Sequence, residues 1–156
     1  MEKLTIRRPD DWHVHLREGT VLKDACRDLS RYIGRAVVMP NLSKPVTNLK
    51  LAKEYYNDIK TAMELFPRQF TPLMTLYLTD KTSSQEIIEA ARSEIICGIK
   101  LYPSGATTNS QSGVVDISSL FPIFEVMQRE KLNLMIHGEV TDSEIDPFDK
   151  EKIFID

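Results

Sequence analysis

The chain has 156 residues, of which 42% are hydrophobic and 28% charged, and its formal net charge at pH 7 is −3. This balance predicts one globular domain over residues 1–156 with a sizeable core, and it argues against the basic surface that binds nucleic acid. No apolar run approaches the roughly 18 residues of a membrane span, and residues 1–8 lack a signal-peptide core. We therefore expect a cytoplasmic protein with neither nucleic acid nor membrane as a partner.

Short apolar runs alternate with helical patterns, which is typical of βα units and a parallel sheet. The first expected strand covers residues 11–16 and is followed by a helix at about 20–32, which ends before Gly34. The second strand covers 35–39, and one face of a long helix at 48–66 carries the next apolar positions. These segments make two βα units.

Two further units follow along the chain. A third strand is expected at 72–78, and a helix at 83–92 opens with Ser-Ser-Gln-Glu, which resembles a capping box. The fourth strand covers 95–101. The loop at 103–113 has no apolar periodicity, and we expect it to be mobile.

The last predicted unit is a helix at 116–130, which Asp116 caps, followed by a fifth strand at 132–137 and a polar, acidic tail. Since a closed (β/α)₈ barrel needs about 250 residues, the chain supplies about five of its eight units and cannot close alone. The alternative for five units is an open, doubly wound sheet. Cys26 and Cys97 lie far apart in sequence and are interpreted as ordinary buried thiols.

Candidate metal ligands lie at the ends of the expected strands. His13 and His15 are two residues apart on a strand, so both side chains leave the same face and could bind one metal ion, and imidazole suits zinc and its neighbours. The alternative is a pair of hydrogen-bonded histidines at a strand end. Asn41, Lys100 and His137 also lie at or just beyond strand ends, and the carboxyl ends of parallel strands form the active-site face of α/β folds.

Lys100 requires a separate explanation, because an ammonium beside a divalent cation is repelled and is costly to bury. A carbamate, formed from its amine and carbon dioxide, would be an anion that can bridge two metal ions. The alternative is a lysine that reaches solvent or pairs with an acid. Both interpretations of Lys100 remain open at this point.

Four segments together resemble the dihydroorotases of the shorter bacterial type, which belong to the metal-dependent amidohydrolases. They are Asp-Trp-His-Val-His-Leu-Arg (11–17), Met-Pro-Asn (39–41), Lys-Leu-Tyr-Pro with Ala-Thr-Thr-Asn (100–109), and Leu-Met-Ile-His-Gly-Glu-Val (134–140). The resemblance covers essentially the whole chain. It implies the N-terminal part of a TIM-type (β/α)₈ barrel, here incomplete, with about five βα units.

The resemblance also implies a reaction and a set of roles. Dihydroorotases use two zinc ions to hydrolyse dihydroorotate reversibly to N-carbamoyl-L-aspartate in pyrimidine biosynthesis, and the full-length family is expected to form homodimers. His13 and His15 would bind one metal ion, His137 the other, and carbamylated Lys100 would bridge them. The substrate would be bound by Arg17, Asn41, Thr107 and Thr108, the threonines lying on a loop that closes over it.

The family pattern needs one more histidine and a catalytic aspartate, and no histidine follows His137. We therefore expect the chain alone to be a poor enzyme or inactive. One alternative is a catalytically inactive half-barrel that self-associates, and another is an amidohydrolase for a different cyclic amide.

Overall fold

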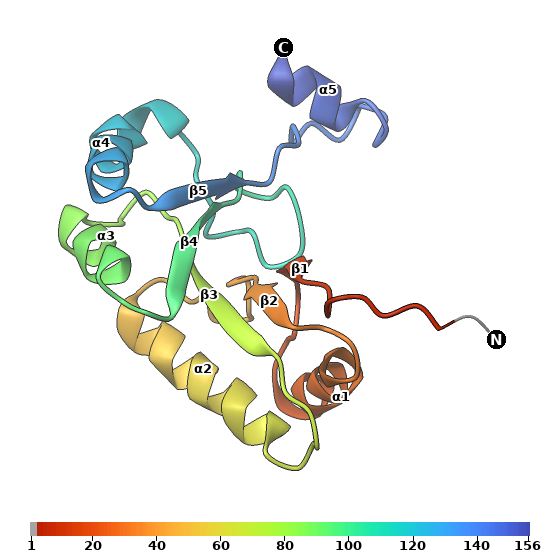
Figure 1. The fold of residues 1–156 in the computed structure, drawn as a ribbon. Coiled ribbons are helices and arrows are strands. Elements are labelled where there is room, and N and C mark those ends of the chain that lie inside the picture. The colour runs from red at the N-terminus through yellow and green to blue at the C-terminus, as the bar shows by residue number, and fades with distance from the viewer. Residues whose placement is uncertain (1–2) are drawn as a thin grey trace.

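The computed structural model describes residues 3–156, which form a five-stranded parallel sheet with helices between the strands (Figure 1). Every neighbouring pair of strands is parallel, and their order in the sheet is the order in the chain. The strands are β1 (Asp11–Val14), β2 (Arg35–Val38), β3 (Thr71–Tyr77), β4 (Ile96–Leu101) and β5 (Asn133–Ile136).

Each connection between strands contains a helix. The helices are α1 (Gly19–Ser30), α2 (Leu49–Met63), α3 (Ser84–Ala91) and α4 (Phe121–Glu130), with a further helix, α5 (Lys150–Ile155), after β5. Strand order never reverses, and α1 packs against α2 as α3 packs against α4, so the sheet is singly wound and curls with these helices outside it (Figure 1). The predicted incomplete barrel is confirmed, and the doubly wound alternative is wrong.

Local sequence explains where most helices begin. The Asn48 side chain accepts a hydrogen bond from the backbone N–H of Leu51 at 3.0 Å, and Ser83 and Glu86 form the predicted capping box. The expected helix at 116–130 is divided into a 3₁₀ turn (Ile117–Leu120) and α4. Pro122 favours a helix start at this point, because it has no N–H to donate to the preceding turn.

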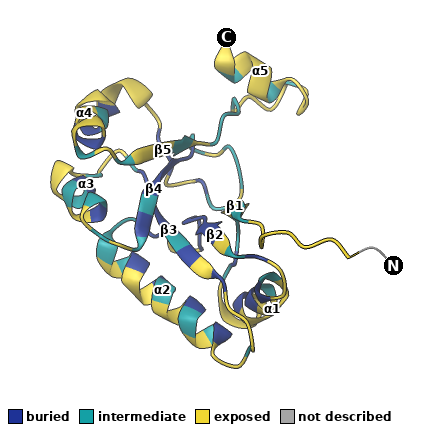
Figure 2. Cartoon of the chain, in the orientation of Figure 1, coloured by how far each residue is buried: buried dark blue, intermediate teal, exposed yellow. Residues whose placement is uncertain are grey.

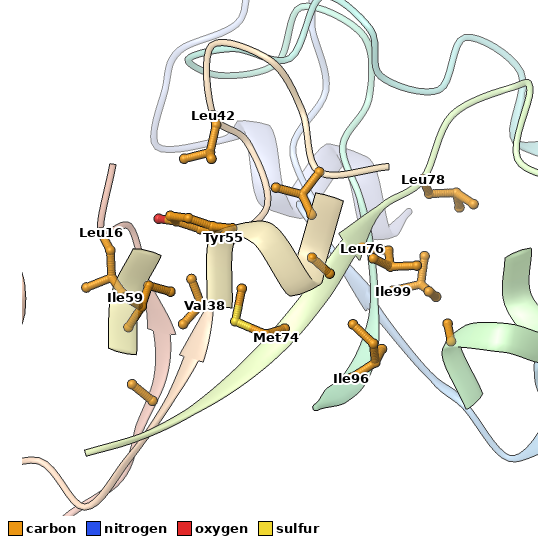
Figure 3. Packing of buried hydrophobic residues seen from close by; sticks show 14 of the residues in the cluster. Leu16, Val38, Leu42, Tyr55, Ile59, Met74, Leu76, Leu78, Ile96 and Ile99 are labelled. Carbon is orange, nitrogen blue, oxygen red and sulfur yellow. The ribbon is translucent and has the colours of Figure 1, made fainter. Parts of the chain in front are cut away.

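The sheet has two different faces. One face packs against α1 to α4 and contributes Ala36, Val38, Met74, Leu76 and Ile99 to the main hydrophobic core (Figure 3). The intervening residues of the same strands point to the opposite, concave face, because side chains alternate along a strand. Val37, Thr75, Tyr77 and Lys100 are therefore buried on that concave face.

The C-terminal part differs most from expectation. The tail predicted to be only polar contains α5, none of whose residues is buried, and Figure 2 shows the exposed positions there and on β5. The α2 helix ends at Met63, three residues earlier than the predicted boundary. Across residues 3–156, no helix has both the length and the apolar character that crossing a membrane requires.

Candidate functional site

Alternation along the strands collects the predicted site residues on the concave face. Lys100 pairs in register with Tyr77 on β3 and with Met135 on β5, so Tyr102 and His137 are the next residues toward the carboxyl ends on the same face. His13 lies on β1, and His15 follows two residues later at the same end of the sheet. The fold therefore places side chains from β1, β4 and β5 on one surface.

His13 and His15 lie side by side. Their Nε2 atoms are 3.3 Å apart, which is a hydrogen-bond distance when one ring is the donor, so the alternative of a hydrogen-bonded pair also fits. Their ring centroids are 5.2 Å apart with planes tilted by 51°. Burial lowers the pKa of both rings most; the charge of Lys100 lowers the pKa of His13 further, and the charge of Arg17 lowers that of His15. Both rings therefore favour the neutral form, which is the form that binds metal ions.

Lys100 is buried on the concave face, with 3% of its surface exposed. Its Nζ lies 5.2 Å from the centre of the Tyr102 ring, and none of the acids in residues 3–156 forms an ion pair with it. Burial lowers the pKa of its amine. Among residues 3–156, therefore, no acid pairs with Lys100, although the residue as a whole is buried.

His137 extends the pairing of β5 with β4, since its N–H donates to the carbonyl of Leu101 at 2.9 Å. Its ring lies 5.9 Å from that of Tyr102, and its Nε2 lies 3.5 Å from Glu139 Oε1 without forming a hydrogen bond. Within residues 3–156 no three His, Cys, Asp or Glu side chains are grouped closely enough to hold a metal ion. His13 and His15 are thus brought into contact, and His137 lies near enough for its charge to lower the pKa of His13 without completing a group of three.

Arg17 and Asn41 meet where the loops after β1 and β2 approach each other. Arg17 has a left-handed backbone with φ of 61°, and its guanidinium donates to the carbonyl oxygen of Asn41 at 3.5 Å. Asn41 is 1% exposed. Its side-chain amide lies near enough to His15 to affect the pKa of that ring, although Asn41 Oδ1 and His15 Nδ1 both lack a hydrogen bond.

The loop at 103–113, which we predicted to be mobile, is folded back on itself. Ser110 is fully buried, and its hydroxyl donates to the carbonyl of Thr107 at 2.6 Å. A side chain at Gly113 would collide with the carbonyl oxygens of Tyr102 and Ser110, which explains the glycine there. The fold places Thr107 and Thr108 beside Asn41, whose amide donates to the carbonyl of Thr108 at 2.9 Å.

Sequence reasoning gave no role to three residues of this surface. Tyr77 and Tyr102 stack with ring centroids 5.1 Å apart, and the Tyr77 hydroxyl donates to the carbonyl of Asn109 at 3.3 Å. Asn109 has φ of 57° and donates its amide to the carbonyl of Asn41 at 3.1 Å. Two features of the sequence could have indicated these roles. Tyr102 lies two residues after Lys100 and so shares its face, and asparagine tolerates a left-handed backbone.

The residues present fit part of a zinc site. Two imidazole nitrogens converge from neighbouring positions, and His15 Nδ1 and His137 Nε2 are buried without a hydrogen bond. Imidazoles with a lowered pKa and a desolvated lysine amine form a set of ligands that zinc accepts once the amine carries an anionic group. His13, His15, His137 and Lys100 would therefore be the ligands.

Comparison with known proteins gives consistent matches in sequence. No family model matches the chain. A dihydroorotase from Shewanella sp. (strain ANA-3) is 55% identical over all 156 residues, and one from Shewanella putrefaciens (strain CN-32 / ATCC BAA-453) is 54% identical. The match covers 100% of this chain and 45% of each relative, so the chain spans just under half the length of the curated relatives it matches.

Solved structures agree with the sequence matches. A dihydroorotase from Campylobacter jejuni is 38% identical with a TM-score of 0.84, over 95% of this chain and 42% of that one. The dihydroorotase from Saccharomyces cerevisiae in complex with 5-fluoroorotic acid is also 38% identical, with a TM-score of 0.80 over 94% and 42% of the two chains. An L-hydantoinase (dihydropyrimidinase) from Arthrobacter aurescens shares the fold, with 18% identity and a TM-score of 0.66 over 85% and 29%.

Proposed function

Because this chain belongs to the dihydroorotase family, we propose that it forms the substrate-carboxylate pocket and part of the metal site of an enzyme that converts dihydroorotate reversibly to N-carbamoyl-L-aspartate. One observation carries the proposal. The paired Nε2 atoms of His13 and His15 lie close in sequence to Arg17, whose guanidinium contacts Asn41, so a metal ion bound by the histidines would adjoin a cationic side chain. The reaction would serve pyrimidine biosynthesis.

The metal part of the proposal depends on the histidines and Lys100. His13 and His15 would hold one zinc ion, His137 would hold a second, and Lys100 would bridge the two ions as a carbamate. The neutral amine of Lys100 would add to carbon dioxide and lose a proton, and its lowered pKa increases the fraction of neutral amine. When bound, zinc would polarise the ring carbonyl and lower the pKa of water.

The substrate part depends on the residues beside the metal site. The guanidinium of Arg17 offers a planar fork of donors that matches a carboxylate, and Asn41 would add an amide contact. Thr107 and Thr108 would offer hydroxyls from the loop, and no hydrogen bond occupies these hydroxyls within the described part of the chain. Such a loop would bind the substrate and exclude water.

Zinc content, native mass and dihydroorotate hydrolysis of the purified chain, with added zinc and bicarbonate, test this proposal. Because the chain supplies part of the site, we expect it to bind zinc in a bicarbonate-dependent way, to lose that zinc in Lys100→Ala, and to show little or no turnover. A folded chain that binds no zinc under these conditions would contradict the proposed metal site.

A different cyclic amide is a second candidate, because the L-hydantoinase shares the fold. The presence of Arg17 beside Asn41 favours a substrate that carries a carboxylate, as dihydroorotate does and hydantoin does not. Hydrolysis of dihydroorotate in preference to hydantoin would decide between them.

Self-association without catalysis is a third candidate, and the exposure of β5 favours it. Leu134 and Ile136 on β5 are 37% and 48% exposed, and Phe148 beyond it is 97% exposed. Sedimentation of the wild-type chain and of Ile136→Lys would test it. A dimer that the lysine dissociates supports self-association, whereas a wild-type monomer contradicts it.

A further inference from the structure

The backbone of Arg17 is in the left-handed region, where a residue with a side chain is disfavoured. It lies between β1 and α1, and the nearby Gly19, with φ of 61°, has the same conformation without that penalty. Strained backbone of this kind persists only where surrounding contacts hold it. The contacts around Arg17 therefore identify the residues that maintain its conformation.

Tyr55 makes the most direct of these contacts. Its hydroxyl donates to the carbonyl oxygen of Arg17 at 2.9 Å, across 38 positions of sequence. The residue is 4% exposed, and Figure 3 shows its ring among core side chains with the hydroxyl directed toward the segment that carries Leu16. The surrounding core thus fixes the position of the donor, and the donor fixes the carbonyl of Arg17.

Glu18, the residue after Arg17, makes a second contact that holds this segment of the backbone. Its carboxylate accepts from the Ser43 hydroxyl at 2.6 Å and from the Ser43 N–H at 3.3 Å. Ser43 lies two residues after Asn41, so this contact joins the loop after β1 to the loop after β2. Between the two contacts, the side chain of Arg17 is directed to the carbonyl of Asn41.

We propose that Tyr55 is a positioning residue for Arg17: its hydrogen bond holds the left-handed backbone that directs the guanidinium toward Asn41 and the substrate carboxylate. This inference rests on the proposed function for the identity of the ligand. Tyr55 itself touches no substrate, because it reaches the site from α2, on the outer side of the sheet. A phenylalanine would fill the same space in the core, so the hydroxyl can be tested separately from the packing.

The first measurement is the backbone φ at residue 17, from NMR chemical shifts and coupling constants of the labelled chain. In Tyr55→Phe we expect residue 17 to leave the left-handed region for part or all of the population. Tyr56→Phe is the matched control, since Tyr56 is the next residue of α2 and is half-buried beside Asn57 and Ile95. An unchanged φ in Tyr55→Phe would overturn the inference.

The second measurement compares two ligands, L-dihydroorotate and dihydrouracil, which is the same ring without the carboxylate. Tyr55→Phe should weaken dihydroorotate binding about tenfold and leave dihydrouracil binding and zinc content within twofold of wild type. Equal weakening of both ligands would indicate general damage to the site and would contradict a role through Arg17. If the wild-type chain binds neither ligand, the proposed function fails, while φ at residue 17 still decides the structural inference.

A third variant covers the case in which Tyr55→Phe does not fold. Arg17→Gly removes the side chain that makes a left-handed backbone unfavourable and keeps the carbonyl that Tyr55 binds. Its Tm should rise, and a lower Tm would mean that Arg17 is not strained and needs no positioning residue.

Discussion

Asn109 donates its side-chain amide to the carbonyl oxygen of Asn41 at 3.1 Å, while Asn41 donates its own amide to the carbonyl of Thr108 at 2.9 Å. The two asparagines thus join the loop after β4 to the loop after β2. Tyr77 supports the arrangement, because its hydroxyl donates to the carbonyl of Asn109. Thr107 and Thr108 are held beside Asn41 by protein contacts alone.

Substitution of Asn109 should loosen this loop. Asn109→Ala removes one hydrogen bond, worth about 1 kcal/mol, and places a less tolerant residue at φ of 57°, which costs roughly 1 kcal/mol more. Hydrogen exchange of the Gly105, Ser110 and Gly113 amides should therefore accelerate at least about tenfold, as a loss of 1.4 kcal/mol implies.

Two variants separate the causes. Asn109→Gly keeps the left-handed backbone and loses only the amide, so its exchange should lie between those of wild type and Asn109→Ala. Asn133→Ala removes a hydrogen bond of the same length, 3.1 Å from the side-chain amide to the carbonyl of Cys97, and should leave the loop unchanged. If all three variants exchange alike, the asparagine pair does not hold the loop.

The two cysteines should react slowly in the folded chain. Burial raises the pKa of Cys26 and of Cys97 from 9.0 to about 11, so at pH 8 the thiolate fraction falls roughly a hundredfold below that of an unfolded thiol. Labelling with a thiol reagent at pH 8 should be slow, and 6 M guanidinium should restore the ordinary rate. Fast labelling of either thiol before unfolding would contradict this burial.

The two cysteines also make the free energy of unfolding depend on pH. The unfolded chain loses its thiol protons near pH 9 and the folded chain near pH 11, so the free energy of unfolding should fall as pH rises through this window. Serine at both positions should remove that part of the fall.

The sequence was sufficient to predict features that depend on residues close together in the chain. Short apolar runs between helical patterns predicted five strands, and the spacing of two residues predicted that His13 and His15 share a face. Ser83 and Glu86 predicted a capping box because that motif is local. These predictions are confirmed, because each depends on neighbours within a few residues.

Features that depend on distant residues were not predicted. Asn41 and Asn109 are 68 positions apart in the sequence, and Tyr55 and Arg17 are 38 positions apart, so no local pattern predicts either contact. The loop at 103–113 resembled an unstructured segment because polar hydrogen bonds, rather than apolar periodicity, fold it. The α5 helix was missed because its 6 residues are too few to show a helical period in the sequence.

Zinc binding should depend most on the histidine pair. His13→Ala and His15→Ala should each lower zinc affinity at least tenfold, because the two Nε2 atoms already converge within 3.3 Å. His137→Ala should change the affinity of this pair less, since its ring contacts Tyr102 instead. Titration with a zinc indicator tests the order, and an equal loss in all three variants would instead place His137 in the same site.

Lys100 should make stability depend on pH in the metal-free chain. Burial lowers the pKa of its amine below the ordinary 10.5, so between these two values the unfolded chain carries a proton that the folded chain lacks. The free energy of unfolding contributed by this residue therefore rises with pH across that window, by about 1.4 kcal/mol for each unit of pKa difference.

Lys100→Met tests this relation, because methionine fills a similar volume without a charge. We expect Lys100→Met to be more stable than wild type at pH 7 by on the order of 1 kcal/mol, and this advantage should vanish above pH 10.5. Urea unfolding at several pH values, with EDTA and without bicarbonate, measures the difference, in which the contributions of the cysteines and tyrosines cancel. Lys53→Met on the exposed side of α2 is the control and should show no such trend. A stability difference that stays constant from pH 7 to 11 would mean that folding does not lower the pKa of Lys100, and the neutral amine that adds to carbon dioxide would then be scarce near pH 7.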